Sequence, residues 1–304
     1  MKNNYIKFIL FLGVLFVIDF SIGSISNLII DRQTSGTIGL INKAILDKSN
    51  ILILGSSRAQ NHYNSRIISE KTKHTVFNAG IGGQGNFAAY AILKERLQKN
   101  NPHIVVLDLA PNIILDLKQF EKLTTFYPLT NKYKSFDSIV TLNPNHKSFL
   151  MYSKAYKYNS TAFDFFYNFI SPNNFNDGFT AIDGKISKIQ IDDELKNENS
   201  IISKKELEMI YLQLSYVNKM KLLCLKKNIE FVSIISPCFL ESLKNKKTRE
   251  LIKNYLDKHN IILHDFSVDK SFTYKQNLFK DLLHLNKKGS DVYSDKVASV
   301  IQMK

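Results

Sequence analysis

The sequence contains little that indicates metal binding or a disulfide framework. It has only two cysteines, Cys224 and Cys238, and they form neither a CxxC pair nor a set with metal-ligand spacing. Cys224 falls in a helical pattern and Cys238 follows a strand pattern, so we expect two buried or isolated thiols. A disulfide between them is compatible with the sequence but not implied by it. Nothing in this arrangement argues for structural zinc.

Signatures of cofactors and nucleic acid are also scarce. The glycine-rich stretch 80–85 is not followed by the Lys-Ser/Thr pair of a phosphate-binding loop. Arginine is rare, and no arginine-rich stripe with interleaved aromatic residues is present. Five histidines have no clustered carboxylates at metal spacing: His74, His103, His146, His259 and His264. We therefore expect no metal, no organic cofactor and no nucleic-acid partner.

Positive charge, by contrast, is abundant. The formal net charge is +14, and most of it comes from scattered lysines. The simplest interpretation is a lysine-rich solvated surface. The alternative is attraction to an anionic surface such as lipid head groups, acidic polysaccharide or teichoic-type polymers.

The N-terminus predicts a membrane anchor over 1–31. Lys2 and Lys7 precede an apolar run over 8–18, and mostly apolar residues resume after Asp19. The whole stretch can span a bilayer, which needs about 20 residues, although a mid-membrane aspartate costs ~2.5–3.5 kcal/mol. Possible cleavage sites are poor, so we favour an uncleaved signal anchor over a cleaved signal peptide or a buried soluble helix. Lysines before the span predict an extracytoplasmic domain, periplasmic or at the cell surface.

The rest of the chain alternates short apolar runs with helical patterns, which predicts crossover units and a parallel sheet. At 304 residues and 44% hydrophobic, it can form one large α/β domain with an accessory segment. The expected organisation is a linker over 32–49 and a three-layer α/β/α domain over 50–304. The expected strands are 51–54, 75–77, 104–109, 229–235 and 261–266.

The regular pattern is interrupted at about 113–200. This stretch is rich in asparagine, serine, lysine and aromatic residues and has weak periodicity. It is interpreted as an insertion over the active edge of the sheet. Ordinary packing of irregular surface helices is one explanation, and a lid or substrate cleft is the other, since long ordered insertions are often functional.

Four separated segments carry the chemical signal. Gly55-Ser56-Ser57 follows the first strand, and 78–83 (Asn-Ala-Gly-Ile-Gly-Gly) follows the second. Leu109-Ala-Pro-Asn112 follows the third strand, and Asp281-Leu-Leu-His284 precedes the last helix. In this order they resemble the four blocks of the SGNH/GDSL hydrolase family. The resemblance covers the chain from about residue 51 to the C-terminus, apart from the insertion, and implies an SGNH/flavodoxin-like five-stranded sheet.

The resemblance implies a role for each matching residue. Ser57 would be the nucleophile, His284 the general base and Asp281 the group that orients His284. The backbone N–H groups of Ser57 and Gly83 and the Asn112 side-chain amide would form the oxyanion hole. Each segment also has a local explanation, such as a helix cap at Ser57 or a tight glycine loop around Gly83.

The sequence departs from the family pattern in the first and third blocks. Ser56 replaces the first-block aspartate, and Arg58 replaces the usual leucine. Arg58 is interpreted either as a ligand for an anionic group or as a surface or salt-bridging arginine. Ala110-Pro111 stands where glycines are usual. These changes resemble the divergent membrane-anchored, envelope-associated branch, which includes proteins that acetylate or deacetylate exopolysaccharides.

The sequence therefore predicts acyl-ester chemistry through an acyl-Ser57 intermediate. Water as the acceptor gives an esterase and a sugar hydroxyl gives an O-acyltransferase, because the same triad serves both. The expected substrate is an acylated envelope carbohydrate or polymer, with a membrane-bound acyl-transfer protein as a possible partner. The alternative is a non-catalytic envelope scaffold or binding module that retains the fold.

Overall fold

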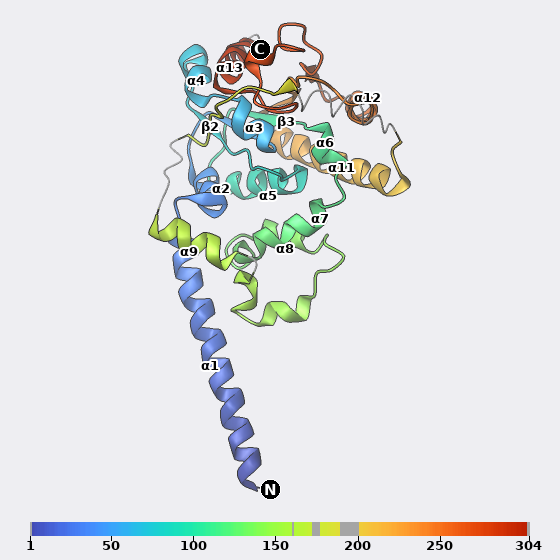
Figure 1. Ribbon diagram of the computed structural model, residues 1–304. Helices are drawn as coiled ribbons and strands as arrows, with labels where there is room; N and C mark the ends of the chain where they lie inside the picture. Colours follow the sequence, from blue (N-terminus) through green and yellow to red (C-terminus); the bar gives the residue numbers. More distant parts are fainter. Residues whose placement is uncertain (1, 160, 172–176, 189–200, 303–304) are drawn as a thin grey trace. The chain divides into compact units, whose positions relative to one another are not determined.

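The computed structural model describes the chain except for residues 1, 160, 172–176, 189–200 and 303–304. The described residues form two compact units (Figure 1). The smaller unit combines 1–42 with 120–174, and the larger unit combines 43–119 with 175–304. The expected insertion at about 113–200 contributes to both units, and its parts at 160, 172–176 and 189–200 lie outside the described residues.

The larger unit is built on one sheet of five parallel strands, which confirms the predicted fold class. The strand order is β2-β1-β3-β4-β5, and every neighbouring pair is parallel. The strands are short, and β1 and β3 in the middle of the sheet are mostly apolar and fully buried, as expected when both faces are covered. They are β1 (Ile51–Leu54), β2 (Val76–Asn78), β3 (Ile104–Asp108), β4 (Glu230–Ile235) and β5 (Leu263–Asp265).

Helices cover both faces of this sheet (Figure 1). Successive side chains of a strand point to opposite faces, so Ile53 and Val106 join one core with Ile68 and Tyr293 from the helices on that side. Here α3, α4 and α13 pack together, while α5 packs against α11 on the other side. The helices are α3 (Ser57–His62), α4 (Ser65–Thr72), α5 (Asn86–Arg96), α6 (Pro111–Ile114), α11 (Lys204–Leu225), α12 (Leu243–Lys258) and α13 (Lys287–Gln302).

The strand order places the predicted site residues at one edge. β1 lies between β2 and β3, so the chain leaves β1 toward one side and later returns on the other. The carboxyl ends of strands at such a switch point border the crevice where open α/β sheets bind ligands. The register pairs Leu54 with Leu107. Ser57 and Asn112 therefore follow their strands at the same edge of the sheet.

Two glycines allow the backbone segments at this edge to approach closely. Gly55 has φ +145°, and a side-chain carbon there would lie 2.8 Å from the carbonyl oxygen of Asp108. A side-chain carbon on Gly80 would overlap the backbone nitrogen of Gln60 in α3. The loop after β2 is further tied to β1 by a hydrogen bond from the Ile81 N–H to the Gly55 carbonyl at 3.0 Å.

The smaller unit is helical. It contains α1 (Lys2–Arg32), η1 (Leu123–Leu129), α8 (Lys134–Val140), η2 (Ser148–Tyr152), η3 (Tyr156–Tyr158) and α9 (Ala162–Ile170). The boundary between the units runs through α2 (Gly36–Leu46) and α7 (Gln119–Lys122). Among the described residues, one helix is long and apolar enough to cross a membrane, over Asn3–Arg32. A signal sequence has the same properties, so the uncleaved anchor stays a prediction.

Both cysteines are free and buried, as expected from the sequence. Burial raises the pKa of Cys224 to about 12 and that of Cys238 to about 11. Both thiols therefore stay protonated near neutral pH, which makes them poor nucleophiles.

The close approach at Gly80 predicts a stability effect. Gly80→Ala adds a carbon where the α3 backbone lies, so we expect it to lower the free energy of unfolding by about 1–3 kcal/mol. Gly82→Ala is the matched control, because its added carbon would lie no closer than 3.5 Å to a neighbouring atom. Urea unfolding followed by circular dichroism measures both variants. Equal stability of the two would contradict the close-packing explanation.

Candidate active site

Ser57 is the first residue of α3 and lies directly after the turn that ends β1. Ser56 is the N-cap of the helix, and its hydroxyl accepts a hydrogen bond from the Arg58 N–H at 3.4 Å. Ser57 is half-buried. The cap is thus formed by Ser56, which leaves the Ser57 hydroxyl available for another partner.

That partner is His284. The Ser57 Oγ lies 2.8 Å from His284 Nε2, although the two residues are 227 positions apart in the chain. On the other side of the ring, His284 Nδ1 lies 2.9 Å from Oδ2 and 3.0 Å from Oδ1 of Asp281. The structure therefore brings together the three residues that the sequence predicted as a triad. Their side chains remain partly open to solvent, with 23% of His284 and 36% of Asp281 exposed.

A tight turn holds Asp281 in place. Its Oδ1 accepts hydrogen bonds from the backbone N–H groups of Leu283 at 2.8 Å and His284 at 2.9 Å. Aspartate commonly forms turns in this way. A bridge between Phe279 and Leu285 closes the loop. The carboxylate is thus fixed beside the histidine ring before any substrate binds.

The hydrogen bonds set the charge of Asp281. Burial alone would raise the pKa of this carboxyl group, but the bonds from the His284 ring and the two backbone N–H groups outweigh burial and hold the pKa below its ordinary value. An ionised carboxylate only accepts hydrogen bonds. The ring proton of neutral His284 therefore sits on Nδ1, and Nε2 is the acceptor for the Ser57 hydroxyl proton.

The two other predicted residues follow β2 and β3, the strands on either side of β1. A side-chain carbon on Gly82 would lie 4.0 Å from the Cβ of Ser57, which places the loop after β2 beside the hydroxyl. Gly83 has φ +73°, and its carbonyl accepts a hydrogen bond from Gln119 at 3.0 Å. Asn112 lies in α6, and its buried Oδ1 has no hydrogen-bond partner among the described residues. No hydrogen bond described here joins Gly83 or Asn112 directly to the triad.

A second histidine supports the loop that carries His284. His62, at the end of α3, is fully buried, and its Nε2 accepts a hydrogen bond from the Leu285 N–H at 3.0 Å. Its Nδ1 lies 3.0 Å from the Ser236 hydroxyl after β4. Burial, then the charge of Arg58 and the nearby His284, lower the pKa of His62 well below its ordinary value. His62 is therefore a neutral ring with its proton on Nδ1.

Arg58 takes neither of the roles that the sequence suggested. Its side chain is 3% exposed, so it is not available to a ligand at the surface. Its Nε donates to the Ser236 hydroxyl at 3.0 Å, and Nη2 donates to the Ser236 carbonyl. Arg58 thus binds α3 to the turn after β4 rather than forming a surface salt bridge.

A buried polar group lies beneath the same turn. Asp108, at the end of β3, accepts hydrogen bonds from the Tyr63 hydroxyl at 2.6 Å and from the Ser236 N–H at 3.2 Å. The Tyr293 hydroxyl lies 3.3 Å from that of Tyr63. Burial, followed by the negative charge of Asp108, raises the pKa of Tyr63 well above its ordinary value. Tyr63 therefore remains a donor that compensates the buried carboxylate.

Residues 177–186 of the expected insertion form a strap along α3. The Thr180 N–H donates to the Gln60 carbonyl at 3.0 Å, and Asn61 Nδ2 donates to the Thr180 carbonyl at 2.8 Å. Further along, the Lys287 N–H donates to the Ile182 carbonyl at 2.8 Å. The strap thus links the helix that begins with Ser57 to the helix that follows His284.

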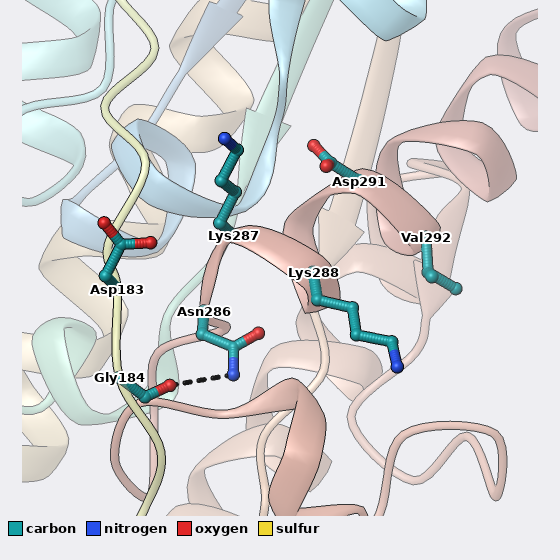
Figure 2. Close-up of a pocket in the computed structure, with 7 residues that line it drawn as sticks. All are labelled: Asp183, Gly184, Asn286, Lys287, Lys288, Asp291 and Val292. Atoms are coloured by element: carbon teal, nitrogen blue, oxygen red, sulfur yellow. Dashed lines mark hydrogen bonds between the residues drawn. The ribbon is translucent and has the colours of Figure 1, made fainter.

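Figure 2 shows an open pocket between the strap and the start of α13. The Asn286 amide crosses it and donates to the Gly184 carbonyl at 2.9 Å. No triad residue lines this pocket, and its charges are mixed, with lysines and aspartates side by side. The lining residues are Asp183, Gly184, Asn286, Lys287, Lys288, Asp291 and Val292.

The contacts that support the site could not be predicted from the sequence. His62 and Ser236 carry no local motif, because their partners lie more than a hundred positions away. The strap over 177–186 was not predicted, because its sequence has weak periodicity. A buried-helix pattern over 57–63 could have indicated that His62 faces the core, but not which atom it contacts.

Overall similarity to known proteins is low. No protein-family model matches the chain, and no curated protein matches its sequence. One similar solved structure is a protein from Desulfitobacterium hafniense assigned to the G-D-S-L family of lipolytic proteins. It has 12% identity and a TM-score of 0.43, with 82% of this chain and 98% of that chain covered.

Another similar solved structure is a protein from Bacteroides fragilis assigned as an acylhydrolase. It has 13% identity and a TM-score of 0.44, with 86% of this chain and 92% of that chain covered. Likeness at this level supports no argument about activity.

The neutral state of His62 predicts that acid destabilises the larger unit. Unfolding lets His62 take up a proton at its ordinary pKa of about 6.5, whereas the folded state does not. Stability therefore falls as pH decreases below that value, down to the lowered pKa of the folded state. We expect His62→Gln to have a flatter dependence of Tm on pH between neutral and mildly acidic conditions.

The exposed His74 provides the matched control for this experiment. Thermal unfolding of His74→Gln should show the same pH dependence as the unsubstituted protein. A pH dependence that is unchanged in His62→Gln would show that His62 is not the titrating group.

Proposed function

We propose that this protein is a serine-dependent acyl-ester hydrolase or O-acyltransferase that acts through an acyl-Ser57 intermediate. The observation that carries the proposal is the continuous chain of hydrogen bonds from Ser57 Oγ through the His284 ring to the Asp281 carboxylate. A nucleophile bonded to a base, with the base oriented by a third group, is the arrangement that nucleophilic catalysis requires.

The chemistry follows from the position of each proton. Ser57 Oγ attacks the ester carbonyl carbon while its proton passes to His284 Nε2, and Asp281 stabilises the imidazolium that forms. The tetrahedral intermediate then collapses: the ester C–O bond breaks, and His284 returns the proton to the leaving alcohol. Water or a second hydroxyl group repeats these steps in reverse order and releases the acyl group from Ser57.

The negative oxygen of the intermediate needs donors that are already in place. Ser57 supplies a backbone N–H from the first turn of α3, where N–H groups have no partner within the helix. We assign the other two donors to the Gly83 N–H and the Asn112 side-chain amide. Two observations support this assignment: the loop that carries Gly83 lies beside Ser57, and Asn112 follows β3, the strand next to β1, at the same edge of the sheet.

We further propose that the substrate is an acylated carbohydrate or polymer of the cell envelope. The partly exposed His284 and Asp281 suit a substrate too large to be enclosed. The apolar helix over Asn3–Arg32 supports a membrane anchor. Lys2 and Lys7 before it favour a larger unit on the extracytoplasmic side. The net charge of +14 favours an acidic polymer. A membrane-bound protein that supplies the acyl group is the partner that the transferase form would need.

Labelling with a fluorophosphonate tests the nucleophile. We expect the full-length protein in detergent to be labelled, and Ser57→Ala to lose the label entirely. Ser69→Ala, in α4, is the control and should be labelled like the unsubstituted protein. Absence of labelling in the unsubstituted protein, or equal labelling of Ser57→Ala, would favour the non-catalytic scaffold.

The Asp281 carboxylate predicts a specific kinetic defect. Asp281→Asn can present its amide nitrogen to Nδ1 and so favour the wrong tautomer of His284. We expect kcat for an aryl acetate to fall by roughly 10³–10⁴-fold, with little change in KM because the ester does not contact this residue. A fall of less than tenfold would remove Asp281 from the catalytic mechanism.

A further inference from the structure

Helix α9 of the smaller unit has five large apolar side chains exposed on its surface. Its polar residues Asp164 and Asn168 line a pocket with Gly36 and Thr37, just beyond the end of α1. The Ser35 hydroxyl also donates to the Asn168 carbonyl at 2.6 Å. A helix on the surface of a water-soluble protein has the opposite arrangement, with polar residues outward. The exposed apolar residues of α9 are Phe163, Phe166, Tyr167, Phe169 and Ile170.

The segment before α9 continues this exposed surface. In η2, Phe149 is 66% exposed and Tyr152 is 89% exposed, while Phe163 of α9 reaches 83%. Exposed large apolar side chains that gather in two short neighbouring segments of the chain are typical of a site of interaction with a protein or a membrane. We use the term apolar collar for the exposed apolar residues of η2 and α9 together.

Hydrogen bonds attach the segment between η2 and α9 to α1 at Asp19. The Asp19 carboxylate accepts hydrogen bonds from the Ser153 hydroxyl, the Lys154 N–H at 2.9 Å and the Ala155 N–H at 3.1 Å. Nearer the C-terminal end of α1, the Tyr158 hydroxyl donates a hydrogen bond to Asn27 Oδ1. The segment between η2 and α9 therefore runs along the half of α1 that begins at Asp19.

The length of α1 places this half of the helix within a bilayer. The hydrocarbon core is about 30 Å thick and needs about 20 helical residues. The apolar run 8–18, which ends before Asp19, rises only roughly 16 Å. A span that begins after Lys7 must therefore include the part of α1 beyond Asp19, where Ile25 and Leu28 are also exposed.

We propose that the apolar collar is immersed in lipid around the C-terminal half of α1, so that this protein contacts the membrane through a second element besides its span. The proposal rests on α1 being a membrane anchor. Tyrosine and phenylalanine beside exposed lysines, here Lys147 and Lys154, suit the boundary between acyl chains and head groups. Lys154 Nζ lies 3.6 Å from the centre of the Phe20 ring.

The collar also explains the aspartate in the apolar helix. Ionisable residues at membrane depth are tolerated when protein groups satisfy them. The hydrogen bonds from Ser153, Lys154 and Ala155 provide that satisfaction, and they carry the collar into the bilayer together with Asp19. The occupant of the apolar surface is therefore lipid rather than a second protein.

The absence of tryptophan from the sequence allows a direct test. Phe163→Trp places one fluorophore in the collar of the full-length protein, reconstituted in vesicles of equal parts phosphatidylcholine and phosphatidylglycerol. Replacing the phosphatidylcholine by lipid brominated near the carbonyl end of its acyl chains should quench most of the emission. Lipid brominated near the methyl end should quench it less.

Two further single-tryptophan variants separate the possible failures. Phe11→Trp reports the span itself, and Tyr274→Trp reports the larger unit, where that side chain is exposed. Quenching of Phe11→Trp and Phe163→Trp but not of Tyr274→Trp is the expected result. Quenching of Phe11→Trp alone would overturn the collar and keep the anchor, including the case in which a protein covers Phe163. If neither Phe11→Trp nor Phe163→Trp were quenched, the membrane anchor would be overturned as well.

Discussion

The hydrogen bond between Ser57 and His284 joins two segments of the larger unit that are 227 positions apart in the sequence. The other contacts of the site hold these two residues in place. Ser57 is placed by the end of β1, whereas His284 is placed by a short loop before α13. The parallel sheet fixes the first, through the pairing of β1 with β2 and β3, and the contacts of α13 with α3 and α4 fix the second.

Close to this bond, buried polar side chains connect α3 to the turn after β4 and to the loop that carries His284. His62 contacts the loop of His284 through Leu285, and both His62 and Arg58 contact Ser236. Because an unpaired buried group costs free energy, these contacts specify one arrangement of α3, the turn after β4 and the His284 loop. Arg58 thus has a structural role at the base of the site.

The sequence allowed the sheet and the triad to be predicted, and the reason lies in the regularity of parallel α/β units. Each apolar run ends where a buried strand ends, so residues after β1 and β3 had to meet at one edge. His284 could be predicted only through the family resemblance, because the loop that carries it has no periodic pattern. The contacts of His62, Arg58 and the strap over 177–186 could not be predicted, since each depends on a partner that is distant in sequence. The apolar surface of α9 was noted only as a concentration of aromatic residues.

In the mechanism that we propose, Ser57 carries the acyl group during turnover. Intact-mass measurement of the full-length protein, rapidly quenched in acid after mixing with an aryl acetate, tests it most directly. We expect an added mass equal to one acetyl group, located by peptide mapping on Ser57 and absent from Ser57→Ala. Acetylation at another residue, or turnover that persists in Ser57→Ala, would contradict it.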